Sequence, residues 1–179
     1  MRRLMLLRHA KAQWPQDAIA GDDYDRPLAP RGEAAALRMG LYLQEQMLLP
    51  DMIIASTAVR AQRTMQIMTP FFDAHIPHCH EPRLYMASPS NVCDVIRGTP
   101  TAVSCLLLIG HNPALGELSA SLIGSGDRYA FARLKTGVPT ASLTVLDFME
   151  HDWHEIGSHK AKLERFVCPN DIMDQPTPL

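Results

Sequence analysis

Apolar residues in this chain occur in short uninterrupted runs and in longer segments where they recur every three or four positions. An uninterrupted run is typical of a strand that is buried on both faces, as in a parallel sheet. The run at 103–109 gives the clearest signal of this kind. Strands are predicted at residues 3–7, 52–55, 78–84, 103–109 and 141–148.

The periodic segments between these runs predict amphipathic helices. The first begins near Arg31. The second extends from the end of the 52–55 strand to about Phe72, with Ser56 and Thr57 as candidate N-caps. The predicted buried positions are Ala36, Leu37, Gly40, Leu41, Met47 and Leu48 in the first helix, and Ala61, Met65, Met68 and Phe72 in the second.

Two shorter helices are predicted later in the chain. One covers residues 91–97 and stops at a Gly-Thr-Pro break. The other follows the strand at 103–109, with Asn112 as candidate N-cap and Pro113 at the first helical position, where a missing N–H is tolerated. The predicted buried positions of this helix are Leu115, Leu118 and Leu122.

The remaining segments are interpreted as connections. Residues 13–30 and 127–141 are predicted to be polar loops, and the chain after Gly157 is predicted to be a C-terminal tail. Strands that alternate with helices are typical of an α/β protein. We therefore expect a three-layer α/β/α sandwich with a mainly parallel central sheet. One domain is expected over residues 1–179, with its core at about 3–150 and its tail at 157–179.

Composition narrows the classes of protein that fit. Of the 179 residues, 46% are apolar and 20% are charged, which suits a folded globular protein. The formal net charge of −2 lacks the basic excess of nucleic-acid-binding proteins. No apolar run approaches the roughly 20 residues of a membrane span, and the four cysteines show no C-x-x-C spacing. We therefore expect a cytoplasmic protein with reduced thiols that binds neither nucleic acid nor a membrane.

Polar side chains stand directly after three of the predicted strands. Arg8 and His9 follow the first strand. Ser56 follows the strand at 52–55, with Arg60 one helical turn later, and Gly110 and His111 follow the strand at 103–109. The carboxyl ends of parallel strands meet at one edge of a sheet, so these residues are expected to share a cleft.

The residue types at this edge suit a tetrahedral phosphoryl group. Guanidinium groups and helix N-termini both bind phosphate oxygens. Arg60 in a first helical turn opposes the helix dipole, so an anionic group is expected to compensate it. No nucleotide-binding glycine loop occurs, which argues against a nucleoside triphosphate or a dinucleotide. The imidazole of His9 is the candidate nucleophile.

Four segments carry a resemblance to a known family. LLRHAKA, which contains His9, resembles the RHG signature of the histidine phosphatase superfamily, in its phosphoglycerate-mutase-like branch. DYDRPLAPRGEAAA, STAVRAQRT and LLIGHNP are similar, in the same order, to segments of its SixA-type subgroup of small phosphohistidine phosphatases. The likeness extends from about Leu4 to Phe148.

The resemblance implies a role for each matching residue. His9 is expected to be the nucleophile that becomes phosphorylated. Arg8, Arg60 and His111 are expected to hold the phosphoryl oxygens and stabilise the developing charge. Asn112, in the LLIGHNP segment, is expected to bind substrate beside them.

The resemblance also implies a reaction without metal or organic cofactor. No H-E-x-x-H motif and no clustered Cys and His spacing occurs. Arg31 in the PRGE segment is expected to support the site rather than take part in catalysis. The other histidines lack neighbouring ligands at suitable spacing and are interpreted as solvated; they are His75, His78, His80, His151, His154 and His159.

Two positions depart from the family pattern. Ala10 replaces the glycine of RHG, a change that the SixA-type subgroup tolerates. Many relatives carry an L-x-E carboxylate that protonates the leaving group, whereas here Leu84 is followed by Tyr85 and Met86. Glu81 is the candidate substitute, or the protein has no dedicated acid. Losing a positioned acid typically costs ~10²–10⁴-fold in rate, but imidazole is a good leaving group, which favours phosphohistidine as substrate.

The predicted function is therefore removal of phosphate from phosphohistidine, most simply on a protein, so the partner is expected to be a phosphohistidine-bearing protein or a small phosphorylated molecule. One alternative is a small-molecule phosphomonoesterase or mutase of the same superfamily. Another is a non-catalytic module that binds phosphorylated proteins. Arg133 and Lys135, in the predicted loop, are either a contact for an acidic protein substrate or simply solvated.

Overall fold

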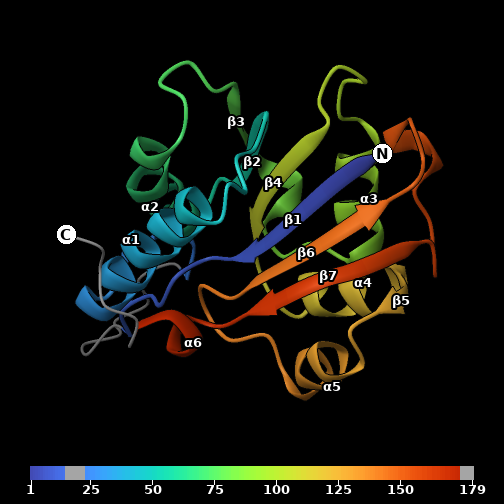
Figure 1. Cartoon of the computed structure of the whole chain (residues 1–179). Helices are drawn as coiled ribbons and strands as arrows, with labels where there is room; N and C mark the ends of the chain where they lie inside the picture. Colours follow the sequence, from blue (N-terminus) through green and yellow to red (C-terminus); the bar gives the residue numbers. More distant parts are fainter. Residues whose placement is uncertain (15–22, 174–179) are drawn as a thin grey trace.

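A seven-stranded sheet forms the centre of the computed structural model, which describes residues 1–14 and 23–173 (Figure 1). Its order is β3-β2-β4-β1-β6-β7-β5. Within it, β6 alone runs antiparallel to the strands beside it, so the sheet is mainly parallel. The strands are β1 (Arg2–Arg8), β2 (Met52–Ser56), β3 (His78–Glu81), β4 (Cys105–Gly110), β5 (Ile123–Gly126), β6 (Leu143–Phe148) and β7 (Ala161–Val167).

Helices cover both faces of this sheet (Figure 1). One layer contains α1 (Pro30–Glu45), α2 (Val59–Met68) and the short α6 (Pro169–Met173). The other contains α3 (Pro89–Arg97), α4 (Ala114–Leu122) and α5 (Arg128–Thr136). The expected three-layer α/β/α architecture is confirmed. Within residues 1–14 and 23–173, none of the helices combines the length and the apolarity that a membrane span requires.

The continuous apolar run of β1 is explained by these two layers. Leu4 and Leu6 pack into the core beneath α3 and α4. Met5 and Leu7 point to the opposite face and pack beneath α1 and α2. Successive side chains of a strand alternate between faces, so a strand covered on both sides is apolar at every position.

The first turn of α1 packs directly on the chain that leaves β1. The backbone N–H of Ala29 donates to the carbonyl of Lys11 at 2.8 Å. Ala12 and Leu28 form an isolated antiparallel bridge. A Cβ added to Gly32 would lie 2.1 Å from the Lys11 carbonyl oxygen. Gly32 therefore allows a backbone approach that no other residue permits.

The predicted buried face of α1 is partly wrong. Ala36 and Gly40 are buried as expected, but the residues that accompany them are Met39 and Leu43, and Leu37 is 53% exposed. Leu37 lies about 100° around the helix from Ala36, beyond the stripe that a spacing of three and four residues defines. Met47, expected to be buried, follows the helix and is exposed.

The predicted N-caps of two helices are also wrong. Ser56 is the last residue of β2, and α2 begins after Ala58 without a side-chain cap. Asn112 precedes Pro113, which is the residue at the N-cap of α4, and the Asn112 amide donates instead to the carbonyl of Val138 at 3.1 Å. The side chains of Ser56 and Asn112 are thus held by the tertiary structure, which outweighs local capping.

The loop predicted at 127–141 contains α5. Asp127 caps this helix by accepting hydrogen bonds from the N–H groups of Tyr129 and Ala130. Ala130 and Leu134 form its buried face, and Gly137 follows its end with a φ of 150°. The N-cap, the four-residue apolar spacing and the terminal glycine are helix signals. The prediction of a polar loop did not take them into account.

The segment predicted as a tail after Gly157 contains β7, which pairs with β6 and β5 inside the sheet. Its register against β6 shifts at Glu164, so the inward positions change phase between Leu163 and Phe166. This irregularity hides the alternation of a strand. In the loop predicted at 13–30, residues 23–25 form a 3₁₀ turn, and 15–22 lie outside the described residues.

We expect Gly32→Ala to lower the free energy of unfolding by about 1–3 kcal/mol, because its Cβ would collide with the backbone carbonyl of Lys11. Urea unfolding followed by circular dichroism measures this change. The matched control is Gly157→Ala, whose Cβ would meet nothing closer than 3.9 Å. Equal stability of the two variants would show that the close approach at Gly32 is unimportant.

Candidate active site

His9 and His111 are brought together by the pairing of β1 with β4. Arg8 stands opposite Gly110 in this parallel register, so the residue that follows each strand emerges at the same edge. The N–H of His9 donates to the Gly110 carbonyl at 3.0 Å. The two imidazole rings lie 4.9 Å apart between centroids, and both are buried.

Arg60 reaches these histidines from the first turn of α2. Its Nε lies 3.3 Å from Nε2 of His9, and its Nη2 lies 3.4 Å from Nδ1 of His111. Thr64, one turn later, donates to the Arg60 carbonyl and accepts from the N–H of Ala10. The start of α2 is thereby tied to the end of β1.

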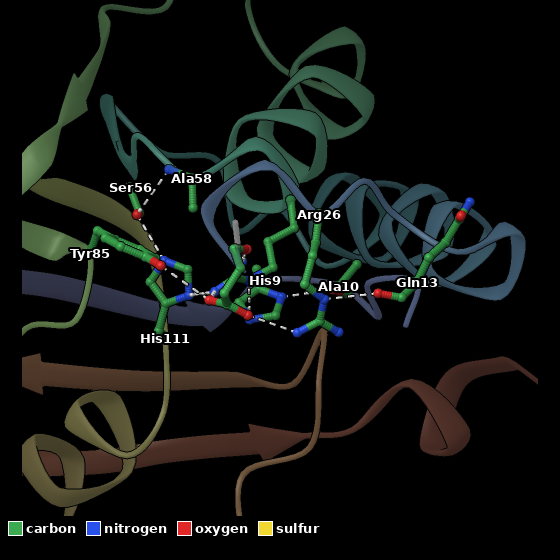
Figure 2. A network of polar contacts seen from close by, with 10 residues as sticks. His9, Ala10, Gln13, Arg26, Ser56, Ala58, Tyr85 and His111 are labelled. Carbon is green, nitrogen blue, oxygen red and sulfur yellow. Dashed lines mark hydrogen bonds and ion pairs between the residues drawn. The ribbon is translucent and has the colours of Figure 1, made fainter. Parts of the chain in front are cut away.

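The hydrogen bonds of His9 define which of its ring nitrogens is free to react. Nδ1 lies 2.7 Å from the carbonyl oxygen of Ala10, which can only accept, so Nδ1 carries the proton. Nε2 faces the Arg60 guanidinium, which can only donate, so Nε2 holds a lone pair. The geometry thus presents a neutral imidazole with Nε2 as its nucleophilic atom (Figure 2).

His111 is held by a similar arrangement. Its Nδ1 accepts from Arg60, so its Nε2 carries the proton and donates to the hydroxyl of Ser56 at 2.8 Å. Ser56 also accepts from the N–H of Ala58 at 3.3 Å, as Figure 2 shows. Ser56 therefore acts as an anchor for the His111 ring.

Both histidines are neutral at pH 7. Burial is the main cause that lowers the pKa of His9 to about 3; the hydrogen bond to Ala10 opposes this shift, and Arg60 and Arg8 add to it. Burial and the Arg60 cation lower the pKa of His111 to about 4. A neutral imidazole is the nucleophilic form, and this environment keeps His9 in that form.

Arg8 adds a further guanidinium group beside Arg60 and the two histidines. Its Nη1 donates to the carbonyl of Val138 at 2.7 Å, the same carbonyl that the amide of Asn112 contacts. Burial and the Arg60 cation lower the pKa of the Arg8 guanidinium. Among the described residues, its buried Nε has no hydrogen-bond partner. A buried donor without a partner suits an anionic ligand that would accept from it.

These residues surround a cavity of about 350 Å³. Four of its lining side chains are cationic, and within the described part of the chain Asp23 is the one carboxylate that lines it. An excess of positive groups at a partly buried site favours a small oxyanion. The lining residues are Arg8, His9, Lys11, Ala12, Trp14, Asp23, Arg26, Arg60, Tyr85, Met86, His111, Asn112 and Thr140.

Asp23, Arg26 and Tyr85 line the cavity and were not predicted from the sequence; Asp23 connects the other two to Arg60. Its carboxylate pairs with Arg60 Nη2 at 2.9 Å and with Arg26 Nη1 at 2.8 Å, and it accepts from the Tyr85 hydroxyl at 3.2 Å. Arg26, then Arg60, hold the pKa of Asp23 down at about 2. The first turn of α2 did indicate that an anion must compensate Arg60, but no local pattern links it to Asp23.

The sequence-predicted residues fall into two groups. Arg8, His9, Arg60, His111 and Asn112 all line the cavity. The lining excludes Glu81, whose carboxylate forms a bidentate ion pair with Arg83 and caps the following 3₁₀ turn.

Met86 does line the cavity. It stands where an L-x-E segment would carry its carboxylate, so the chain keeps the position of that acid without the acidic group.

Among the described residues, no three His, Cys, Asp or Glu side chains gather in a way that could hold a metal ion. The side chains that line the cavity include imidazole, guanidinium and amide groups. Groups of these kinds can bind an oxyanion, and an imidazole nitrogen can act as a nucleophile.

The lowered pKa values predict how stability depends on pH. The unfolded chain, whose histidines titrate near 6.5, takes up protons before the folded protein does, so stability falls as pH decreases from about 6.5 towards the folded pKa values near 4 and 3. Each buried histidine is expected to cost about 2 kcal/mol between pH 6.5 and 5.

Urea unfolding of the wild type and of His111→Asn at pH 7 and pH 5 tests this expectation. The variant should lose about 2 kcal/mol less stability across the interval than the wild type. The matched control His75→Asn, at an exposed histidine, should keep the wild-type pH dependence. Identical pH dependence in wild type and His111→Asn would contradict the lowered pKa.

Comparison with known proteins agrees with this geometry. Residues 4–85 match the model of the histidine phosphatase superfamily (branch 1). An uncharacterised protein of Mycobacterium tuberculosis is 36% identical over 166 residues, which cover 91% of this chain and 99% of that protein.

Solved structures show the same fold. The Agrobacterium tumefaciens protein assigned as the phosphohistidine phosphatase SixA superposes with a TM-score of 0.78 at 30% identity, over 94% of this chain and 98% of that one. An Escherichia coli protein assigned as an α-ribazole-5′-P phosphatase shares the fold at 18% identity, with a TM-score of 0.63, over 94% and 98% of the two chains. From the family match and the nearly full-length relatives, this chain belongs to the histidine phosphatase superfamily.

Proposed function

We propose that the protein is a phosphohistidine phosphatase, and that His9 carries the phosphoryl group between substrate and water. Membership of the superfamily supports phosphatase activity in general. The choice of phosphohistidine is supported by the 30% identity to the Agrobacterium SixA protein and by the chemistry of the cavity.

In the first step, Nε2 of His9 attacks phosphorus. A bond forms between this nitrogen and phosphorus, and the bond between phosphorus and the substrate imidazole breaks. The substrate ring carries a proton on its other nitrogen, so it leaves as neutral imidazole without a proton from the protein. The guanidinium groups of Arg8 and Arg60 neutralise the charge on the equatorial oxygens, and the neutral ring of His111 and the amide of Asn112 lie beside them. The carbonyl of Ala10 holds the ring in orientation through Nδ1.

In the second step, water attacks the phosphorus on His9. The bond from phosphorus to Nε2 breaks, inorganic phosphate leaves, and His9 returns to its neutral form with its proton on Nδ1. The low pKa of the buried imidazole makes it a good leaving group. The same environment that makes His9 a free nucleophile therefore also allows the intermediate to hydrolyse.

The observation that carries this proposal is that the described residues of the cavity include no carboxylic acid that is protonated at neutral pH. Met86 occupies the position where a carboxylic acid would protonate the leaving group. Asp23 is ionised at neutral pH because its pKa is lowered to about 2. An alkoxide needs a proton to leave, whereas imidazole leaves readily, so the site suits a phosphoramidate better than a phosphate ester.

A small-molecule phosphomonoesterase is the second candidate. The fold that this chain shares with the protein assigned as an α-ribazole-5′-P phosphatase favours it, because that name describes a phosphate ester as substrate. Met86 weighs against it, because this side chain cannot protonate the alkoxide that leaves from an ester.

We expect wild-type protein mixed with a radiolabelled phosphohistidine peptide and quenched in base to retain label that acid removes. His9→Asn should retain none and should lose at least about 10³-fold in kcat. A phosphoserine peptide of the same sequence should be hydrolysed about 10²-fold less efficiently. Absence of labelled protein under rapid quench would refute a covalent intermediate, and equal rates on both peptides would refute the substrate choice.

Met86→Glu should restore the missing proton donor. We expect its kcat/KM for a phosphomonoester such as a phosphoserine peptide to rise about 10-fold or more over that of Met86→Gln, while the two variants remain similar on phosphohistidine. The glutamine variant controls for shape and polarity.

A further control is Glu81→Gln, which should leave both activities at the wild-type level because this carboxylate is paired with Arg83 outside the cavity. If Met86→Glu gave no more ester hydrolysis than Met86→Gln, the absent acid would not be what limits ester substrates.

A further inference from the structure

A second cavity of about 370 Å³ adjoins the active-site cavity. The two share Lys11 and Thr140 in their linings, so the two cavities lie side by side. Its lining residues are Lys11, Arg31, Ala35, Pro139, Thr140, Cys168, Pro169 and Asn170. None of the catalytic steps above uses it.

The backbone brings two cations together in this second cavity. The hydrogen bond from Ala29 to Lys11 and the close packing of Gly32 on the Lys11 carbonyl fix the first turn of α1 against the exit of β1. Lys11 and Arg31, twenty positions apart in sequence, therefore line one space.

The positive charge of this space is not balanced by the described residues. No carboxylate is among its lining residues, and neither Lys11 nor Arg31 forms an ion pair within residues 1–14 and 23–173. The neighbouring acids are engaged elsewhere: Glu33 pairs with Arg63, and Asp171 pairs with Arg133. Arg31 also stands in the first turn of α1, where the helix dipole adds to the positive potential.

The apolar part of the lining distinguishes between kinds of anion. Ala35, Pro139 and Pro169 contribute carbon surface beside the two cations. A peptide offers aliphatic atoms and an acidic side chain together, whereas a small bisphosphate offers only charged oxygens. An extended peptide advances about 3.3 Å per residue, so a residue within a few positions of the phosphohistidine can lie in a neighbouring cavity.

We infer that the second cavity binds an acidic side chain, Asp or Glu, that lies within a few residues of the phosphohistidine in a protein substrate. This inference rests on the proposed function and deepens it. The active-site cavity takes the phosphoryl group, and Lys11 and Arg31 select the sequence around it by charge complementarity.

Two phosphohistidine peptides of equal length test the inference, one with Asp around the phosphohistidine and one with Asn at the same positions. We expect the wild type to prefer the Asp peptide by about tenfold in kcat/KM, mainly through KM, and to lose this preference at high salt. The double variant Lys11→Gln/Arg31→Gln should show no preference. Lys162→Gln removes an exposed cation that lines neither cavity and should keep the wild-type preference.

Phosphoimidazole and p-nitrophenyl phosphate separate this inference from the proposed function, because neither molecule carries a flanking residue. Failure to hydrolyse phosphoimidazole and both peptides, with p-nitrophenyl phosphate still turned over, would overturn the proposed function. In that case the unphosphorylated Asp peptide, used as an inhibitor of p-nitrophenyl phosphate hydrolysis, still measures docking, and Arg31→Gln should weaken its inhibition several-fold.

Three results would overturn the inference itself. The first is equal kcat/KM of the wild type for the Asp and Asn peptides. The second is a preference that survives in the double variant. The third is inhibition by a small bisphosphate that exceeds inhibition by the Asp peptide and depends on Arg31, which would identify the cavity as a second phosphate site.

Discussion

The rest of this structure depends on one constraint, which is the burial of arginine and histidine side chains around one small cavity. His9, Arg60 and His111 are each less than a tenth exposed, and Asp23 is the carboxylate that the described chain places against them. Burying unbalanced positive charge is costly, and a bound oxyanion relieves that cost. The same burial keeps His9 neutral, which makes nucleophilicity and anion binding two results of one environment.

The fold satisfies this constraint with few elements. The parallel register of β1 and β4 places the two histidines side by side, and the first turn of α2 brings Arg60 between them. Backbone carbonyls of Ala10 and Val138 then orient His9 and Arg8. Because these acceptors belong to the main chain, the orientation of the site depends on the packing of the sheet rather than on further side chains.

The proposed substrate preference rests on two side chains that line the cavity. Met86 provides no proton, and Asp23 is held ionised by two guanidinium groups, so the leaving group must depart without assistance from either. Lys11 and Arg31 line the neighbouring cavity and extend the positive potential beyond the first one. In the proposed function, the first cavity holds the reacting phosphorus and the second recognises the surrounding chain.

Local pattern determined the strands β1, β2 and β4 and the residues that follow them. A strand that is buried on both faces is apolar throughout, so the polar residues after it mark where the strand ends. Local pattern did not reveal β7, whose alternation is broken at Glu164, or the pairing of Asp23 with Arg60. That pairing joins residues on separate segments, and only the packing of those segments sets the distance between them. Tertiary structure alone decided which carboxylate faces the cations and which two cations line the second cavity.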